Sequence, residues 1–384
     1  MMSSNDVFIS GCGVFLPNAP IPNEQIEEVL GTVNAISSKV KRRVLMNNGI
    51  RTRYYAIDPR SREKTHTNAQ LTAEAIRTLA LNARLDLQRL ECLVCGTSSP
   101  DQLIPNHGSM VHAELGVPPC EVATTAGVCC AGMSALKYGY MNVGSGNVRN
   151  AVVTGSELAS PSLTADHFRS EMAFLREELG REPMLSFDTD FLRWMLSDGA
   201  GALLLTNEPT SEHALRIDWL DILSYAPETE VCMYSGLKKE SGPSTKSYRR
   251  VVDPVQLYKE GFLDLCQDVA VLKDRLPVLM VKAIEHVKMK RELSARAIDW
   301  LLPHYSSDWF RQPLFDAIAR LGLEIPFERW FTNLTAKGNT GSASIYIILE
   351  ELVSSGLLHS GQRILCMVPE SARMTFAFMH LTVV

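Results

Sequence analysis

The sequence lacks any apolar run long enough to cross a membrane. Its longest apolar stretches, such as Ala200–Leu205 and Ile345–Leu349, have the length of strands or short helices. The first residues lack the basic and apolar segments of a signal peptide, so we expect a cytoplasmic protein. Charge of one sign is not in large excess: the net charge is −5 over 384 residues, which gives no reason to expect a nucleic-acid partner. With 46% hydrophobic residues, the composition is that of a globular protein with a sizeable core.

Cysteine is present without the pattern of a disulfide framework or a zinc site. The nine cysteines are an odd number spread over a long chain, which favours reduced thiols. Cys92 and Cys95 form a C-x-x-C pair, but the segment around them is typical of a buried strand, on which these side chains point to opposite faces. No second C-x-x-C or pair of histidines completes a zinc site, so we expect no metal.

Strands and helices are predicted to alternate along the chain, which favours an α/β architecture. Two segments look irregular: Ser160–Thr189, which we interpret as a lid or an insertion, and Pro227–Pro254, which we interpret as an exposed loop. The predicted strands are Val7–Ser10, Cys92–Gly96, Ala151–Gly155, Gly201–Leu205, Ile298–Pro303 and Arg363–Val368. The predicted helices are Asn68–Leu81, Gly132–Val143, Tyr258–Lys288 with an interruption at Pro277, Gln312–Leu321 and Gly341–Ser354.

A weak symmetry relates two parts of the chain. In the first part a strand-like run leads to Cys129–Gly132 and then a helix, and in the second Trp330–Leu334 leads to Gly338–Gly341 and then a helix. Both parts place reactive or polar side chains where a loop enters a helix. The pattern is compatible with an internally duplicated fold.

The segment Ala123–Leu136 carries the most chemistry, because small residues surround Cys129 and Cys130. Small residues let the backbone turn sharply and let a substrate approach closely. The helix that follows directs unpaired N–H groups toward the thiol, an arrangement that lowers a thiol pKa and can hold an oxyanion. Cysteines also pack in cores, so this segment alone leaves catalysis and packing both open.

Two further residues favour catalysis. His304 follows the apolar strand Ile298–Pro303, at the carboxyl end where open sheets place their sites. Asn339 lies in a loop of small residues that enters an apolar helix. Taken singly, the histidine could be structural and the asparagine a helix cap or turn residue. Together, cysteine, histidine and asparagine in such settings suit thioester chemistry.

Three motifs carry a resemblance to a known family. Val128-Cys-Cys-Ala-Gly-Met, Leu302-Pro-His-Tyr and Gly338-Asn-Thr-Gly-Ser-Ala-Ser resemble the active-site motifs of the β-ketoacyl-acyl-carrier-protein synthase III family, in that family's order. Gly49-Ile-Arg-Thr-Arg and Ser197-Asp-Gly-Ala-Gly-Ala extend the resemblance. It implies a thiolase fold of five layers (αβαβα), with residues 1–210 and 211–384 as two similar halves, and a homodimer.

The resemblance also implies roles for these residues. Cys130 directly precedes Ala-Gly and is therefore the nucleophile, with Cys129 as its buried neighbour. His304 and Asn339 are the donors that stabilise the enolate of the second substrate. The substrates arrive on coenzyme A or on the phosphopantetheine of an acyl carrier protein, and no cofactor is tightly bound.

Further candidates follow from the same comparison. Arg51 is expected to contact the phosphopantetheine or nucleotide end of the donor, while Arg53 is either a second contact or a solvated surface residue. Ile104 stands where the family often has an aromatic residue that reaches the partner's acyl pocket, so a smaller side chain here leaves room for a longer or bulkier chain. Glu157 is either a proton acceptor or a structural partner for a backbone N–H or an arginine.

The end of the chain departs from the family pattern. It reads Pro369-Glu-Ser where the family carries a glycine-rich stretch, although a backbone N–H near Ser371 could complete an oxyanion hole. This wall and the stretch Phe191–Ala202 look more like the branch that joins two acyl chains into dialkylcyclohexanediones, the precursors of dialkylresorcinols. The leading hypothesis is therefore a condensing enzyme of secondary metabolism that uses a β-ketoacyl extender. The alternatives are malonyl condensation that initiates fatty-acid synthesis, simple acyl transfer, and a non-catalytic subunit.

Overall fold

The computed structural model describes residues 5–35, 38–211, 214–240 and 244–384. Its framework is a sheet of nine strands in the order β13-β14-β15-β8-β1-β7-β6-β4-β5. These strands are β1 (Phe8–Phe15), β4 (Cys92–Thr97), β5 (Glu121–Ala126), β6 (Asn150–Glu157), β7 (Gly199–Thr206), β8 (Leu215–Ser224), β13 (Trp300–Pro303), β14 (Arg363–Glu370) and β15 (Thr375–Val383). The helices that pack on them are α3 (Asn68–Ala83), α4 (His107–Leu115), α5 (Cys130–Gly144), α9 (Val269–Arg291), α10 (Arg311–Arg320) and α12 (Ser344–Ser354).

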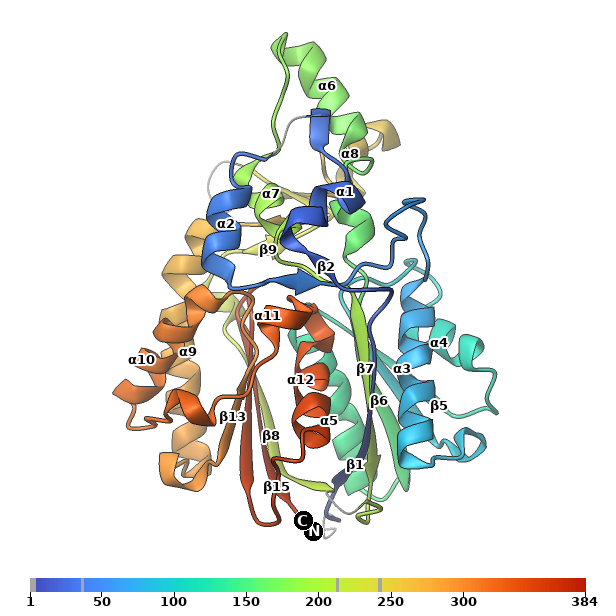
Figure 1. Cartoon of the computed structure of the whole chain (residues 1–384), viewed down its shortest axis with the longest axis vertical. Coiled ribbons are helices and arrows are strands. Elements are labelled where there is room, and N and C mark those ends of the chain that lie inside the picture. Colours follow the sequence, from blue (N-terminus) through green and yellow to red (C-terminus); the bar gives the residue numbers. More distant parts are fainter. Residues whose placement is uncertain (1–4, 36–37, 212–213, 241–243) are drawn as a thin grey trace.

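The elements form five layers, as Figure 1 shows. α5 and α12 lie in the middle, between the two parts of the sheet, which meet where β1 and β8 pair over two residues only. α3 and α4 cover the outer face of one part, and α9 and α10 cover the outer face of the other. Because both faces of the central strands are covered, their sequences are nearly continuous apolar runs. The predicted αβαβα architecture is confirmed.

The two parts of the sheet repeat one pattern of pairing. In the first part β1, β7 and β6 are antiparallel neighbours and β4 is parallel to β6. In the second part β8, β15 and β14 are antiparallel neighbours and β13 is parallel to β14. The counterpart of β5 is reduced to one parallel bridge between Leu301 and Trp330. The predicted division at residue 210 falls in the connection from β7 to β8 and stays a prediction.

Three apolar clusters fill the spaces between the layers. One lies under α3 and α4, one surrounds α5 and α12, and one lies under α9 and α10 and continues into the upper part of the molecule. Cys92 belongs to the middle cluster and Cys95 to the outer one, so the two side chains do face opposite sides of β4. All six predicted strands are present, with ends that differ by a few residues.

One predicted helix was wrong in extent. The segment Tyr258–Lys288 contains the end of α8 (Pro254–Lys259), the short strand β12 (Cys266–Gln267) and most of α9, whose start Asp268 caps by accepting from the Val271 N–H at 2.9 Å. Pro277 does not interrupt α9. It removes one hydrogen bond, but buried Leu276 and Met280 hold the helix against the core on both sides of the proline.

The two segments predicted to be irregular are partly ordered. Within Ser160–Thr189 the chain forms α6 (Arg169–Leu179) and the start of α7 (Phe187–Arg193), and it projects at the top of Figure 1. Residues 227–254 contain three short strands, β9 (Met233–Tyr234), β10 (Leu237–Lys239) and β11 (Thr245–Ser247), while residues 241–243 lie outside the described residues. The short elements α1 (Ile26–Leu30), β2 (Ile21–Pro22), β3 (Thr52–Arg53), α2 (Lys41–Asn48) and α11 (Leu334–Lys337) complete the fold.

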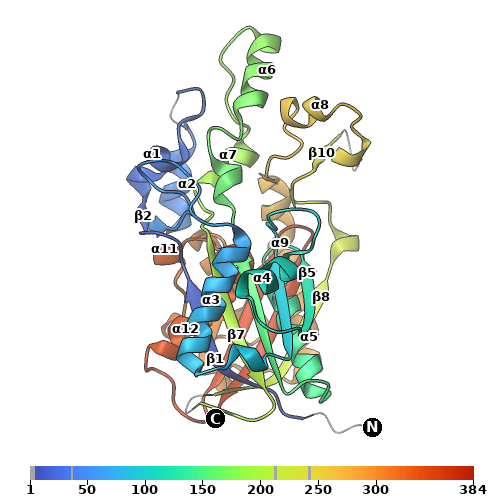
Figure 2. The ribbon, with the colours of Figure 1, turned by 90° about the vertical axis from the view of Figure 1, so that its right-hand side faces the viewer.

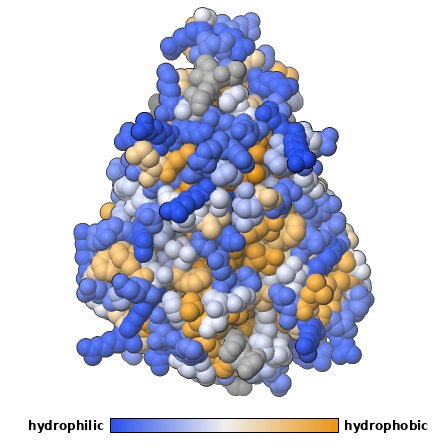
Figure 3. Space-filling view, in the orientation of Figure 1, coloured by the Kyte–Doolittle hydropathy of each residue, from blue (hydrophilic) through white to orange (hydrophobic). Residues whose placement is uncertain are grey.

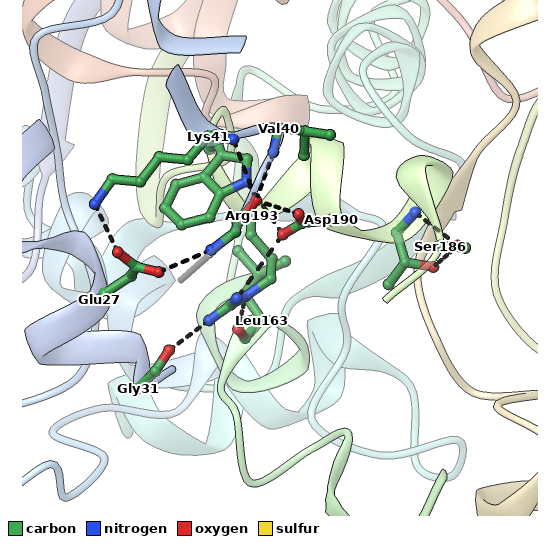
Figure 4. Close-up of polar contacts among 11 residues, drawn as sticks. Glu27, Gly31, Val40, Lys41, Leu163, Ser186, Asp190 and Arg193 are labelled. Atoms are coloured by element: carbon green, nitrogen blue, oxygen red, sulfur yellow. Dashed lines mark hydrogen bonds and ion pairs between the residues drawn. The ribbon is translucent and has the colours of Figure 1, made fainter. Parts of the chain in front are cut away.

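The upper part, seen from the side in Figure 2, is held together by a polar network around α7 (Figure 4). The buried guanidinium of Arg193 donates to the carbonyls of Leu163 at 2.8 Å and Gly31 at 2.7 Å. Asp190 accepts from the Trp194 indole at 3.1 Å and from Ser38. These bonds fix α7, and with it the apolar residues that follow, against Leu163 and against Gly31 and Ser38 near the N-terminus.

The surface is uneven in polarity. In the view of Figure 3, hydrophilic residues cover most of the projecting upper part, and hydrophobic ones gather lower down, between α12 and α3. Within the described ranges, no helix combines the length and the apolar character that a membrane crossing requires.

Candidate active site

A cavity of about 770 Å³ lies between the two halves, a volume usual for small-molecule sites. Polar residues from both halves line it: Cys129, Glu157, His304, Asn339 and Ser371. The lining also includes the polar residues Lys64, His66, Gln70, Ser98 and Ser99. A further part of the lining is apolar and is called the apolar arm: Leu272, Leu276 and Met280 of α9, Phe310 directly before α10, and Leu314 and Ala317 of α10.

His304 is placed by the sheet. The backbone N–H of His304 donates to the Met367 carbonyl at 2.8 Å, which continues the β13–β14 ladder by one residue. This backbone position turns the imidazole into the cavity. Burial lowers the pKa of His304 to about 4, so the ring is neutral near pH 7 and has one N–H to donate. Within the described residues neither ring nitrogen has a hydrogen-bond partner, which leaves that donor available to a ligand.

Asn339 is placed by a loop that is fixed on both sides. Its N–H donates to the Met195 carbonyl at 3.0 Å, and its carbonyl accepts from the Ser197 N–H at 2.9 Å. Gly338 before it has φ +71°, and a Cβ there would lie 2.9 Å from the Cβ of Ser197, so only glycine fits. The side-chain oxygen of Asn339 accepts from the Gly341 N–H at 3.0 Å. Among the described residues none accepts from its amide N–H₂, and Asn339 lines the cavity, so this donor is available to a ligand.

The two adjacent cysteines take different directions. Cys129 lines the cavity, whereas Cys130 is not among the lining residues. The thiol of Cys130 instead faces the carbonyls of Val368 at 3.3 Å and Thr375 at 3.7 Å, at the facing ends of β14 and β15. The structure therefore brings Cys129, His304 and Asn339 together and turns the Cys130 thiol toward the sheet.

The expected effect of α5 on the thiol is contradicted. Burial raises the pKa of the Cys130 thiol well above its ordinary value, and the carboxylate of Glu370 raises it further. The N–H of Cys130 is not free, because it donates to Glu370 Oε2 at 2.9 Å, as does the N–H of Val128. The positive end of the helix is thus matched by a negative side chain before it can favour a thiolate.

Glu157 is buried beside the cysteines. Its carboxylate accepts from the hydroxyls of Ser98 and Ser99, each at 2.5 Å, and from the Ser342 N–H at 3.3 Å. Burial raises its pKa although these hydrogen bonds oppose the shift. Glu157 therefore has structural partners and also reaches the cavity, so both interpretations of this residue stand.

The remaining candidates lie around the site or outside it. Ser371 lines the cavity, and its hydroxyl donates to Gln267 Oε1 at 3.0 Å. Arg51 is exposed and does not line the cavity, and neither does Ile104, which is 87% exposed. Arg53 is not a surface residue: it is buried, and its guanidinium donates to Asn23 Oδ1 at 2.8 Å and to the Trp194 carbonyl at 3.2 Å.

Comparisons with known proteins find relatives over most of the chain. Residues 289–369 match the family 3-Oxoacyl-[acyl-carrier-protein (ACP)] synthase III C terminal. The chain is 25% identical to β-ketoacyl-[acyl-carrier-protein] synthase III of Clostridium perfringens over 355 residues, which cover 92% of this chain and 93% of the relative. The chain is a ketosynthase III-like condensing enzyme.

Solved structures support the fold of this ketosynthase III-like enzyme. The tetronic acid condensing enzyme AbyA1 superposes with a TM-score of 0.75 at 20% identity and covers 98% of this chain and 99% of its own. A variant of OleA from Xanthomonas campestris, crystallised with lauric acid and lauroyl-CoA, superposes with a TM-score of 0.73 at 18% identity, covering 99% and 100%. Both share the thiolase fold.

Sequence reasoning missed three features of the ketosynthase site. It treated Cys129 as a buried neighbour, and it saw Glu370 only as a change in a wall. It also missed the apolar arm, whose residues come from two helices that are separate in sequence. The acidic residue in place of a glycine-rich stretch was a signal for Glu370; no sequence pattern indicated the arm.

Proposed function

We propose that this enzyme loads an acyl group on a cysteine at the start of α5 and joins it to a second thioester by a Claisen-type condensation. The observation that carries the proposal is the pair of free donors, His304 and Asn339, which face one cavity beside the cysteines. Simple acyl transfer has no enolate for such a pair to stabilise. A non-catalytic subunit has no need of either donor.

In the first step a cysteine thiolate attacks the acyl thioester, with Cys130 as the nucleophile that the motif favours. The new C–S bond replaces the bond to the carrier, and the cysteine's proton leaves on the carrier thiol. The carrier is coenzyme A or an acyl carrier protein. The step stores the acyl group as an enzyme thioester and divides one difficult reaction into two.

In the second step an enolate forms on the other thioester. A base removes the proton between the two carbonyls of a β-ketoacyl donor, and Glu157 is the candidate because burial raises the pKa of its carboxyl. The neutral imidazole of His304 and the amide of Asn339 donate to the developing enolate oxygen. The carbanion attacks the acyl carbonyl, the new C–C bond forms, and the cysteine leaves as thiolate and regains a proton.

The apolar arm supports long acyl chains. The arm consists of buried aliphatic and aromatic side chains, such as Leu276 of α9, Phe310 directly before α10 and Leu314 of α10, and it offers an alkyl chain an apolar environment. A short malonyl-derived substrate would leave it empty. We therefore propose an enzyme of secondary metabolism that joins two acyl chains into a cyclohexanedione or resorcinol precursor, ahead of one that initiates fatty-acid synthesis.

A second candidate for the nucleophile is Cys129. It faces the cavity that holds His304 and Asn339, whereas the Cys130 thiol faces two strand carbonyls. Cys129 is the residue that precedes α5, and Cys130 is the first residue of that helix. The motif favours one residue and the geometry favours the other.

The test is intact-mass analysis with a panel of acyl-CoA and acyl-carrier thioesters of different lengths. Wild type, Cys129→Ala and Cys130→Ala are compared, and tandem mass spectrometry locates the adduct. We expect Cys130→Ala to abolish the adduct and Cys129→Ala to keep it; the reverse result assigns the nucleophile to Cys129. Equal adducts on both variants and on the double variant would contradict the loading step itself.

A homodimer is part of the proposal. Leu103 lines the cavity and is 76% exposed, and the adjacent Ile104 is 87% exposed. Two large apolar side chains in contact with water beside a site are typical of a surface that a partner covers. Sedimentation at micromolar concentrations is expected to give a dimer for wild type and a weaker one for Leu103→Asp.

A further inference from the structure

Glu370 is a buried carboxylate that the condensation steps do not use. It is the last residue of β14, and its neighbours Pro369 and Ser371 line the cavity. Because side chains alternate along a strand, Glu370 points the other way, toward the start of α5. It is 7% exposed, and its Oε2 atom accepts from the N–H groups of Val128 and Cys130, both at 2.9 Å.

The chain provides room for this contact. Gly127 has φ +153°, and a Cβ at that position would lie 3.3 Å from Glu370 Oε2, tighter than an ordinary contact. The turn before α5 therefore accepts the carboxylate without a side chain in between. The bond joins residues 128 and 130 in the first half to residue 370 in the second.

We propose that Glu370 occupies, in the resting enzyme, the anion-binding N–H groups that acylation requires, and that its carboxylate must leave before the acyl group is loaded. The proposal rests on the loading step described above. When the thiolate attacks a thioester, the carbonyl oxygen becomes an oxyanion that needs donors at the nucleophile. The Cys130 N–H is such a donor, but it already donates its only hydrogen bond to Glu370.

The negative charge of Glu370 opposes acylation, as does its occupation of the N–H groups. An oxyanion beside a carboxylate would place two negative charges on one pair of donors. The same charge opposes the thiolate, since Glu370 raises the thiol pKa of both Cys129 and Cys130. The other acidic group that affects this pair is Glu157, which acts on Cys129. The resting geometry thus suppresses reaction of the thiol until a substrate rearranges the wall at residues 369–371.

Two reactions of the same thiol distinguish the effect of Glu370 occupying the N–H groups from the effect of its negative charge. Alkylation by iodoacetamide needs a thiolate but creates no oxyanion, whereas acylation by an acyl-CoA needs both. Rates of the two are measured by tandem mass spectrometry, with adducts assigned to Cys129 or Cys130, over a range of pH. Wild type is compared with Glu370→Gln, which loses the charge and keeps an oxygen that accepts the N–H groups, and with Glu370→Ala, which loses both.

We expect Glu370→Gln to speed both reactions equally by shifting their pH profiles to lower pH. We expect Glu370→Ala to speed acylation by roughly tenfold or more beyond its effect on alkylation, because the donors become free. Slower acylation by Glu370→Ala at unchanged alkylation would show that Glu370 assists the step, and equal changes in both reactions would show an effect of charge alone; each result overturns the proposal. If the alanine variant fails to fold by circular dichroism, Glu370→Asp, which shortens the side chain, replaces it; the excess of acylation over alkylation should be in the same direction but smaller, because the retained charge still repels the oxyanion.

A matched control is Asp253→Ala. Asp253 accepts from a helix N-terminal N–H, that of Val255, at 2.9 Å, but it lies outside the cavity. The Asp253→Ala variant should change neither the alkylation rate nor the acylation rate. Absence of any acyl adduct on wild type would instead refute the loading step, so failure of the proposed function is distinguished from failure of this inference.

Discussion

The backbone of Asn339 is hydrogen-bonded to Ser197, whose N–H donates to the Asn339 carbonyl at 2.9 Å. The loop of the second half that carries Asn339 is thereby attached to the segment that leads into β7 of the first half. Because main-chain atoms make this attachment, the side chain of Asn339 can be changed without release of the loop.

Replacement of Asn339 by alanine is expected to separate the two chemical steps. The variant should load the acyl group at nearly the rate of wild type, while condensation falls by about 10²–10³-fold, the usual effect of one lost oxyanion donor. Intact mass follows loading, and chromatography of the product follows condensation. Equal losses in both steps would show that Asn339 serves loading or folding instead of the enolate.

Asp198 is expected to be a main source of stability. Its buried carboxylate accepts from the N–H groups of Ala56 at 2.7 Å, Ala159 at 2.8 Å and Ser160 at 2.9 Å, so it joins three segments near the site. Asp198→Asn places an amide N–H₂ against these donors and should lower the free energy of unfolding by about 1–3 kcal/mol. Urea denaturation measures the change, and an unchanged midpoint would contradict it.

The lowered pKa of His304 predicts that the stability of the protein depends on pH. Its folded pKa, about 4, is below the ordinary 6.5, so the unfolded chain takes up the proton first as pH falls. This side chain should therefore lower the free energy of unfolding between pH 6.5 and 4, by up to about 3 kcal/mol, and have no effect above that window. His304→Asn should flatten the profile from urea denaturation, and the exposed His286→Asn should not. Parallel profiles for wild type and His304→Asn would refute the shift.

The apolar arm predicts a preference for chain length. Ala317 lines the arm on α10, so Ala317→Leu should fill part of it and shift loading or condensation toward shorter acyl chains. Ala319→Leu, on the same helix but outside the lining, is the control. A competition assay with mixed acyl-CoA lengths measures the shift. If both variants keep the wild-type distribution, the arm does not hold the chain.

Ile104 gives a contrasting prediction. It is 87% exposed in the single chain, so its effect on chain length depends on a partner subunit. Ile104→Trp should narrow the preference only if a dimer places it in the neighbouring site. The same competition assay, with sedimentation of both proteins, tests this, and a change in a protein that stays monomeric would contradict the role through the partner.

The sequence alone determined the main outlines of this enzyme. Apolar runs of strand length that alternate with helical patterns predicted the layered α/β fold, since such runs are buried on both faces. Three short motifs in a fixed order resembled those of a condensing-enzyme family, and this resemblance indicated thioester condensation and made His304 and Asn339 candidate site residues. These features depend on local spacing, which a sequence displays directly.

Other features depend on contacts between segments that are far apart in the chain. The bond from Glu370 to Cys130 spans 240 residues, and it reverses the expected effect of the helix on the thiol pKa. Which of Cys129 and Cys130 faces the cavity depends on how β14 and β15 pack against α5, and the apolar arm exists because α9 lies beside α10. Local pattern cannot specify these relationships, because burial and electrostatics at a site are set by all the elements that surround it.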